Sequence, residues 1–358
     1  MNETNKQNID GITESTINQA NGDIVITTVN GVSAVEVVQI CNDVMRTQMD
    51  IYTKQATVTA QERFNYFCDN FTSRLETVES KVAEQLKEPS IQIALHESIK
   101  GSIDGNEDEL TNELIDLMIE RMSITDRCSE QFIIDEARRT LPKLTKVHLA
   151  FMALKVFTRL RLANNRVEFS DILFVKLSNA LELISFFTKL DLNYLGQIGC
   201  VANPLLLLNN KSVEQIFLDA YDLYFRKGCP LDDFNRLNAE TQLKINELGV
   251  VLSNSTIIDG CVYLNIISTK SLRPADPPFE KVIPFVKRIA EICNSYTEED
   301  VRENLIQGSN LWDSALKVLN ALGKNAHLSP LGEYLGLRYL SKLLGRSIPL
   351  SLFYDESK

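Results

Sequence analysis

The chain has 358 residues, of which 44% are hydrophobic, and its formal net charge at pH 7 is −11. This length and apolar content can supply a sizeable core, and a prior of one domain per roughly 100–200 residues predicts two or three lobes. An acidic chain without a run of Lys or Arg lacks the basic surface that broad binding to nucleic acid or to an anionic membrane requires.

The seven cysteines are scattered, odd in number and never at C-x-x-C spacing: Cys41, Cys68, Cys128, Cys200, Cys229, Cys261 and Cys293. We interpret them as small apolar residues in a reducing compartment. The opening MNETNKQNIDG is polar where a signal peptide needs an apolar segment. We therefore expect a cytoplasmic protein.

The first strand signal lies in GDIVITTVNG, residues 22–31, after a polar tract that we expect to be disordered alone. Ile24, Val25, Ile26 and Val29 place apolar side chains on both faces of this strand, so it must be covered or paired. Packing on the helical body, pairing with another copy and a mobile arm all remain open. Pairing between copies would make the protein a homo-oligomer that associates through these four residues.

Capping boxes at Ser33 and Thr59 predict two helices, the second of them rich in Phe and ended by Pro89. Apolar spacings of 3 and 4 along both favour an intramolecular hairpin, with a coiled coil as the alternative. Asn106 is expected to cap an acidic helix, and Ser129 one that ends at Pro142.

Residues 143–190 read as two helices that are apolar nearly all round and form the centre of the protein. Lys155 and Arg159 interrupt the first, and Lys176 and Glu182 the second. A membrane span needs roughly 20 mostly apolar residues with few charges, so we expect no membrane span here.

Residues 190–212 lose the helical period, which predicts a lobe boundary; Ser212 then begins a new helix. Short strands are expected at 250–252 and 261–267. Later helices are predicted to be capped by Thr297 and Ser329, the last with Pro330 at its first position and Gly345 at its end. Its apolar face recurs at four-residue spacing, at Leu331, Leu335, Tyr339 and Leu343.

Two signatures in the C-terminal half carry a resemblance. In the first, a predicted helix that includes Leu243 ends at Leu248-Gly249 and is followed by the apolar pair Val250-Val251. The second is the sequence HLSPLGEYL at residues 327–335. Together they resemble a winged-helix-type module and the C-terminal part of bacterial phage-abortive and defence-island proteins. The N-terminal half, from GDIVITTVNG to the acidic helix and Leu141-Pro142, resembles an uncharacterised bacterial helical family. That family implies no catalytic residue.

The predicted fold is therefore mainly α: a multi-helix bundle with a short N-terminal strand and a small winged-helix-like α+β C-terminal lobe. The predicted domains are a polar tract with the strand at 1–32, a helical bundle at 33–200 and a helical lobe with winged-helix-like elements at 201–358.

No motif for catalysis, metal binding or cofactor binding appears in the sequence, so we predict no catalytic, cofactor-binding or metal-ligating residue. The three histidines, His96, His148 and His327, lie far apart, and His148 is the best candidate for burial. Trp312 fits an apolar helix stripe and is expected in the core.

Three functional interpretations stay open. The first is a non-enzymatic cytoplasmic scaffold or sensor that acts by contacts with protein. Phage defence is among the roles that this interpretation covers. The second is a DNA-binding regulator that uses Arg338, Lys342 and Arg346, which share one side of the last helix. The third is an enzyme whose site is assembled from scattered residues. The acidic charge disfavours the second.

Overall fold

The computed structural model describes residues 34–49, 54–105, 107–163, 165–202, 211–225, 228–241, 252–254, 260–264, 285, 287–288, 296–324 and 326–349. These residues are mostly helical, as predicted. They divide into two compact units, 1–143 and 144–358, and each is described by itself. In the described part of the chain no helix is long and apolar enough to cross a membrane.

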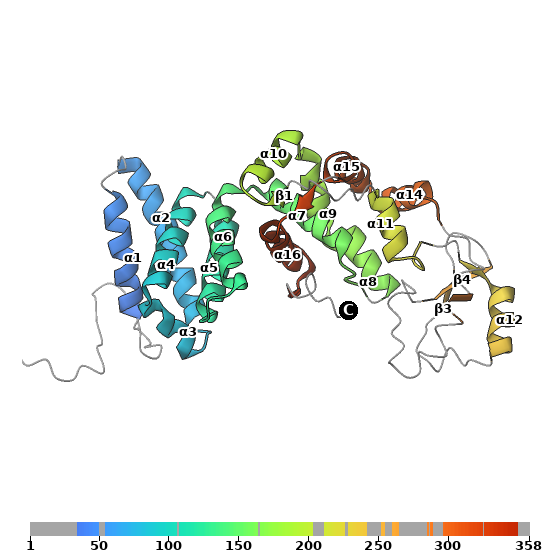
Figure 1. Cartoon of the computed structure of the whole chain (residues 1–358), viewed down its shortest axis with the longest axis horizontal. Helices are drawn as coiled ribbons and strands as arrows, with labels where there is room; N and C mark the ends of the chain where they lie inside the picture. The colour runs from blue at the N-terminus through green and yellow to red at the C-terminus, as the bar shows by residue number, and fades with distance from the viewer. Residues whose placement is uncertain are drawn as a thin grey trace, which may run out of the picture. The chain divides into compact units, whose positions relative to one another are not determined.

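Unit 1 is built of helices (Figure 1). Their bounds are α1 Ala34–Met49, α2 Lys54–Leu75, α3 Ser80–Glu84, η1 Gln85–Lys87, α4 Pro89–Asp104, α5 Asp108–Ser123, α6 Ser129–Thr140 and η2 Leu141–Lys143. Helix α1 packs on α2, α2 on α4 and α5, and α6 on α5 and α4. The contact of α1 with α2 agrees with the predicted hairpin.

The core of unit 1 follows one face of α2. Phe64, Phe67 and Phe71 recur at three- and four-residue spacing and are buried, as the sequence pattern predicts. They belong to one cluster with Leu95 of α4 and Met118 of α5. Burial of such aromatic side chains dominates the stability of a core of this kind.

The predicted helix starts in unit 1 were partly wrong. Thr59 lies inside α2, which begins at Lys54, and its hydroxyl is bonded to the Gln55 carbonyl rather than acting as a cap. The N-cap residue of α6 is Cys128, because Ser129 is already the first residue of the helix. Ser33 and Asn106 lie outside the described residues.

Helices and five short strands make up the described part of unit 2. The elements up to residue 241 are α7 Lys146–Arg159, α8 Arg166–Asp171, the π-helical turn η3 Ile172–Lys176, α9 Ser178–Leu183, η4 Ile184–Phe186, α10 Lys189–Gln197, β1 Val201–Ala202, α11 Val213–Ala220, β2 Cys229–Pro230 and α12 Leu231–Thr241. The later ones are β3 Leu252–Asn254, β4 Cys261–Leu264, α14 Glu298–Gly308, α15 Leu311–Val318, the π-helical turn η7 Leu319–Gly323, β5 His327–Leu328 and α16 Pro330–Leu344.

The centre of unit 2 is the packing of α16 along α7, the largest contact between described helices. Gly332 and Gly336 share one face of α16, where a Cβ would meet the carbonyl of Cys200 and the backbone of Met152 respectively. These glycines therefore allow close backbone approach. Leu331, Leu335 and Tyr339 of the predicted apolar face are buried, and Leu343 is partly buried.

The second predicted central helix is interrupted by η3. Leu177 N–H donates to Ile172 O at 3.1 Å, five residues back, so the carbonyl of Leu173 does not accept that bond. Leu173 O instead accepts the indole N–H of Trp312 at 3.1 Å. Trp312 is fully buried, which confirms the core prediction, and its indole bonds to a carbonyl within the turn.

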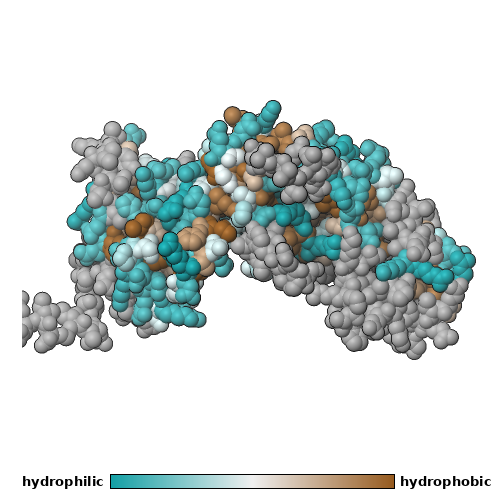
Figure 2. All heavy atoms as spheres, viewed as in Figure 1, coloured by the Kyte–Doolittle hydropathy of each residue, from teal (hydrophilic) through white to brown (hydrophobic). Residues whose placement is uncertain are grey.

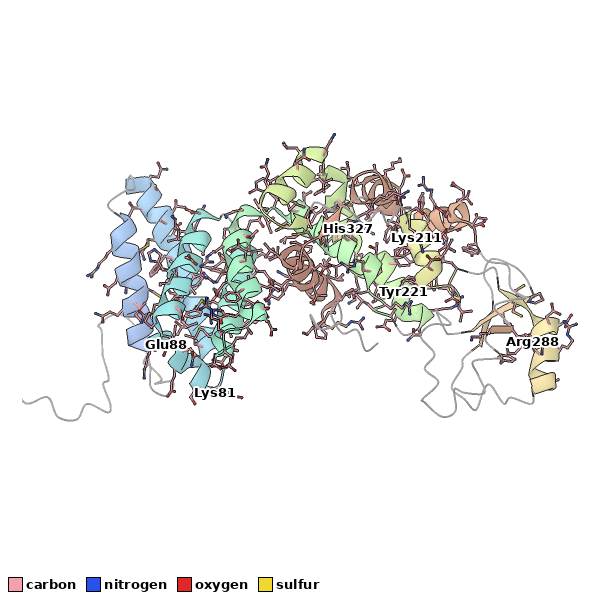
Figure 3. All side chains as sticks on the ribbon, in the orientation of Figure 1. Lys81, Glu88, Lys211, Tyr221, Arg288 and His327 are labelled. Carbon is pink, nitrogen blue, oxygen red and sulfur yellow. The ribbon has the colours of Figure 1, made fainter. Side chains whose placement is uncertain are left out.

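An aromatic cluster lies between α8 and α11. Tyr221, labelled in Figure 3, packs against Phe169 with ring centroids 3.9 Å apart and the rings tilted by 32°, and its hydroxyl donates to Leu160 O at 3.2 Å. Phe217 contacts Phe157 and Trp312 edge to face. Burial raises the pKa of Tyr221 to about 12.

The described strands of unit 2 form two small antiparallel sheets. Strand β1 pairs with β5, with Val201 opposite Leu328, and β4 lies between β2 and β3, with Cys229 opposite Val262 and Ser253 opposite Tyr263. Of the strands predicted at 250–252 and 261–267, Leu252 lies in β3 and residues 261–264 form β4, and the other residues of both lie outside the described ranges. A winged-helix lobe is not confirmed: residues 242–251 lie outside the described ranges, and 327–335 form β5 and the start of α16.

The compact units divide at 143/144, whereas the loss of helical period predicted a lobe boundary near residue 200. Residues 190–197, the start of the stretch that we expected to be irregular, belong to α10. The boundary differs because α7, the first helix of unit 2, packs against α16, the last. A contact between segments so far apart in the chain leaves no local mark in the sequence.

Candidate functional site

The four residues predicted to mediate self-association, Ile24, Val25, Ile26 and Val29, lie outside the described residues. The self-association of the strand therefore stays a prediction.

Of the three residues predicted to contact DNA, Arg338 lies in the middle of α16, Lys342 lies in its last turn, and Arg346 follows its end. Arg338 places its guanidinium 5.8 Å from the Tyr334 ring centroid and donates to the Tyr334 hydroxyl at 3.3 Å. Lys342 is exposed. Arg346 follows the left-handed cap Gly345, as predicted for the helix end, and donates to Glu168 Oε1 at 2.7 Å and to Leu162 O. Intramolecular contacts hold both guanidinium groups, and DNA contact stays a prediction.

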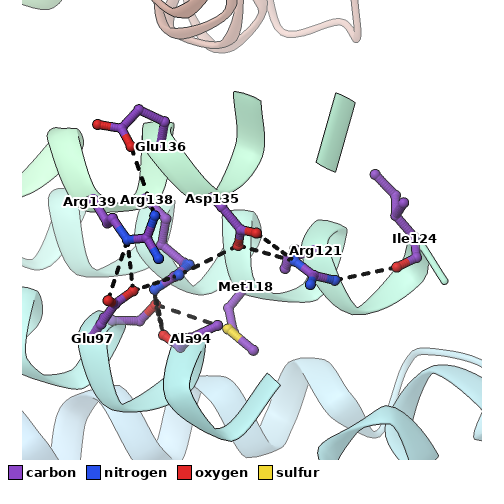
Figure 4. Close-up of polar contacts among 10 residues, drawn as sticks. Ala94, Glu97, Met118, Arg121, Ile124, Asp135, Glu136, Arg138 and Arg139 are labelled. Carbon is purple, nitrogen blue, oxygen red and sulfur yellow. Dashed lines mark hydrogen bonds and ion pairs between the residues drawn. The ribbon is translucent and has the colours of Figure 1, made fainter. Parts of the chain in front are cut away.

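A buried network of charges joins α4, α5 and α6 (Figure 4). Arg121 Nε donates to Asp135 Oδ1 and Oδ2 at 3.1 and 3.2 Å. The Arg138 side chain is 1% exposed, lies 2.9 Å from Glu97 Oε2 and 3.5 Å from Asp135 Oδ1, and donates to Ala94 O at 2.5 Å. Charge-assisted bonds of this kind compensate for desolvation of the buried guanidinium.

Glu97 accepts bonds from two arginines, the second being the half-exposed Arg139 at 3.1 Å. Burial raises the pKa of Glu97, but the hydrogen bonds and charges of Arg138 and Arg139 outweigh it and hold that pKa below its usual range. The carboxylate is thus ionised and fastens α4 to α6, which is a structural role.

A second buried carboxylate, Glu214, lies in the first turn of α11 and is only 2% exposed. Its Oε1 accepts from Arg302 Nε and Nη2 at 3.1 and 2.9 Å, and its Oε2 accepts from Asn320 Nδ2 at 2.8 Å. Asn320 Oδ1 also accepts the N–H of Val213 at 2.9 Å. The carboxylate therefore ties α11 to α14 and η7.

His148 connects the capping boxes of two helices. Its Nδ1 accepts from the backbone N–H of Thr145 at 3.1 Å, which leaves Nε2 to donate to Asp191 Oδ1 at 3.1 Å. Asp191 Oδ2 accepts from Thr188 N–H at 2.7 Å and from the Thr188 hydroxyl at 2.6 Å. Burial raises the pKa of Asp191, but these bonds outweigh it and lower the pKa. His148 is 5% exposed, which confirms its predicted burial.

Lys155 is a largely buried cation on α7. Its Nζ donates to Gly323 O at 2.8 Å, at the end of η7. Burial and then the charge of Arg159 lower the pKa of Lys155 to about 8. Arg159 itself pairs with the buried carboxylate of Glu333 on α16. These contacts fasten α7 to two neighbouring elements.

Large apolar side chains remain exposed at the start of α10. Phe186, the last residue of η4, is 68% exposed, and Leu190, in the first turn of α10, is 76% exposed. Figure 2 shows hydrophobic atoms at the surface over α10. Neighbouring residues 182 and 189 are an exposed Glu and an exposed Lys. An apolar surface with charges of both signs around it suits contact with a protein.

The networks above use their charged groups to hold helices together. Among the residues that the structure describes, no three His, Cys, Asp or Glu side chains lie together as metal ligands. The predicted lack of catalytic, cofactor and metal residues stays a prediction.

The sequence pattern predicted neither the charge networks described above nor the exposure of Phe186 and Leu190. Thr188-Lys189-Leu190-Asp191 has the threonine and acidic residue of a capping box, which could have predicted α10. Glu214 gave no such signal, because Arg302 and Asn320 are 88 and 106 residues away. Long-range partners cannot be inferred from spacing.

Comparison with known proteins adds a family and no activity. No curated protein and no solved structure matches the chain. One protein-family model, of an uncharacterised family, matches residues 31–354 and so spans both compact units. The chain belongs to this family.

Proposed function

We propose that this protein acts by binding another protein, as a non-enzymatic scaffold or sensor of the cytoplasm. The observation that supports the proposal is the exposure of Phe186 and Leu190 at the start of α10. Exposed aromatic and aliphatic side chains supply most of the energy of protein contacts when a partner buries them.

The chemistry around this pair favours a protein over nucleic acid as the partner. Glu182 and Lys189 provide charges of both signs, and the chain as a whole carries a net charge of −11. A nucleic-acid surface would need cations free to neutralise phosphates. The expected partner therefore presents apolar side chains within a polar rim.

The test compares binding by the native chain, the double variant F186S/L190S and the control Val167→Ser, which changes another residue that is 76% exposed. The proteins are used as bait in lysate of the source cells, and recovered proteins are quantified by mass spectrometry. A partner retained by the control and lost by the double variant supports the proposal. Identical recovery with all three contradicts it.

Self-association through residues 22–31 is a further part of the proposal. Light scattering with size exclusion on the full chain and on a fragment that starts at Val32 tests it. A larger full chain, reduced in size by Ile24→Asp with Ile26→Asp, would support pairing of this strand. Equal masses would assign any oligomer to another surface.

The alternative is a DNA-binding regulator with a winged-helix-like C-terminal lobe. Titration of the full chain with duplex DNA at two salt concentrations tests it, because phosphate contacts weaken as salt rises. Salt-dependent binding that Lys342→Ala reduces would favour this alternative over protein binding. A role in phage defence, which the resemblance implies, would appear as a change in phage plating when the gene is deleted.

A further inference from the structure

The exposed apolar pair Phe186 and Leu190 lies on a rigid part of unit 2. Phe187, between them in the chain, is buried and stacks on Phe151 of α7, with ring centroids 4.0 Å apart. The first turn of α10 is also joined to α7, because His148 bonds to the carboxylate of its capping box. These contacts hold the backbone around the pair, so both side chains remain at the surface until a partner buries them.

One acidic and one basic side chain flank this pair. Glu182 lies in α9, one helical turn before Phe186, and Lys189 directly precedes Leu190 at the start of α10. Both charged residues are exposed. No ion pair joins Glu182 or Lys189 to another side chain in the described part of the chain. The surface therefore offers a partner two apolar groups and one free charge of each sign.

We propose that the partner at this surface is a second copy of the chain, bound about a two-fold axis. The inference rests on the proposed function, which requires a partner that presents apolar side chains within a polar rim. The same surface of a second copy meets that requirement. A two-fold interface joins one surface to itself, so the surface must be complementary to itself.

The charges of this surface provide that complementarity. Glu182 of each copy has Lys189 of the other copy as its opposite charge, and Phe186 and Leu190 of both copies supply the apolar contact. Charge pairs at a rim select the partner more than they add affinity. Because the surface contains few large apolar groups, we expect a dimer that dissociates on dilution.

The net charge of the chain also favours this surface over others for self-association. Each copy carries −11, so two copies repel each other at long range. Around the apolar pair the charges of Glu182 and Lys189 cancel. Two copies that meet here bring no excess of like charge into the contact.

Reversal of charge tests the inference whatever the register of the two copies. Glu182→Lys leaves two cations beside the apolar pair, and Lys189→Glu leaves two anions. Each single variant therefore repels its own copy in any two-fold arrangement. Light scattering with size exclusion on the native full chain should give a mean mass that rises with concentration above the 40.5 kDa of one chain. Each single variant should stay at the mass of one chain.

Two further samples are expected to recover the larger mass. The double variant E182K/K189E again carries one charge of each sign, and an equimolar mixture of the two single variants joins a cationic surface to an anionic one. Recovery also shows that the single variants are folded. Glu303→Lys, at an exposed residue of α14, changes the net charge as Glu182→Lys does and should associate like the native chain.

The inference is overturned if the native chain has the mass of one copy at every concentration, or if the mixture of single variants does not associate. A native dimer that F186S/L190S leaves intact overturns it too, since that dimer uses another surface. Binding from lysate separates this result from a failure of the proposed function. A native monomer whose lysate partner is lost by F186S/L190S refutes only the second copy as partner, whereas identical recovery by all three baits contradicts the proposed function itself.

Discussion

At the scale of single residues, Arg138 and Arg139 bind the same carboxylate but differ in burial. The Arg138 side chain is 1% exposed and that of Arg139 is 47% exposed. Arg138→Ala should lower the free energy of unfolding by about 3–5 kcal/mol, because it removes charge-assisted bonds of a buried guanidinium and leaves a cavity between α4 and α6. Arg139→Ala should cost about 0–1 kcal/mol, as for exposed ion pairs. Urea denaturation checks both, and equal losses would show that burial does not distinguish the two arginines.

Lys155 gives a dependence of stability on pH. Its pKa is about 8 in the folded chain against an ordinary value of 10.5. Between these values the unfolded chain binds more protons than the folded one, so the free energy of unfolding rises with pH. The stability of the native chain relative to Lys155→Met should increase by about 2 kcal/mol from about pH 7.5 to about pH 9.5.

Denaturant titrations at several pH values measure this difference, and groups unaffected by the substitution cancel. Lys155→Met keeps a long apolar stem, so the volume between α7 and η7 changes little. A difference that is constant with pH would mean that the Lys155 ammonium is solvated in the folded protein.

At the scale of elements, the crossing of α7 and α16 depends on glycine. A Cβ on Gly336 would lie 2.8 Å from the carbonyl carbon and oxygen of Met152, whereas one on Gly196 of α10 would meet nothing within 4 Å. Gly336→Ala should therefore destabilise by about 1–3 kcal/mol or more through overpacking. Gly196→Ala should stabilise by about 0.5–1 kcal/mol through helix propensity. Thermal unfolding checks the pair, and a harmless Gly336→Ala would show that the helices can separate at little cost.

Helical periodicity and end signals predicted elements well where they are local. Ser212, Thr297 and Ser329 all cap helices as expected, each accepting an N–H three residues on. The π-helical turn η3 was not predictable, because the carbonyl of Leu173 within it accepts from Trp312, which lies 139 residues further along the chain. Local rules predict where helices begin; partners distant in sequence decide where they deform.

The same limit applies to the candidate site. Exposure of Phe186 and Leu190 could not be predicted, because they belong to a run of apolar residues whose other members, Ile184 and Phe187, are buried. The composition of the segment was clear, and only the packing selected the residues that matter.

At the scale of the whole molecule, the sequence pattern and the structure divide the chain at different residues. Loss of period near residue 200 predicted a boundary there, yet the compact units divide at 143/144. Composition marks where a helix stops, but a unit is defined by which helices share a core. Here α7 and α16 share a core although almost all of unit 2 lies between them in the chain.

The two divisions predict different folding of fragments. Fragments 1–143 and 144–358 each keep the contacts within one unit, so each should show helical circular dichroism and a cooperative unfolding transition. A fragment 201–358 separates α16 from α7 and exposes the buried Leu335 and Tyr339 of α16. It should lack a cooperative transition or aggregate, because that apolar face has lost its partner. If 201–358 unfolds cooperatively and 144–358 does not, residues near 200 are the true boundary, and the packing of α16 on α7 is not what holds the second unit together.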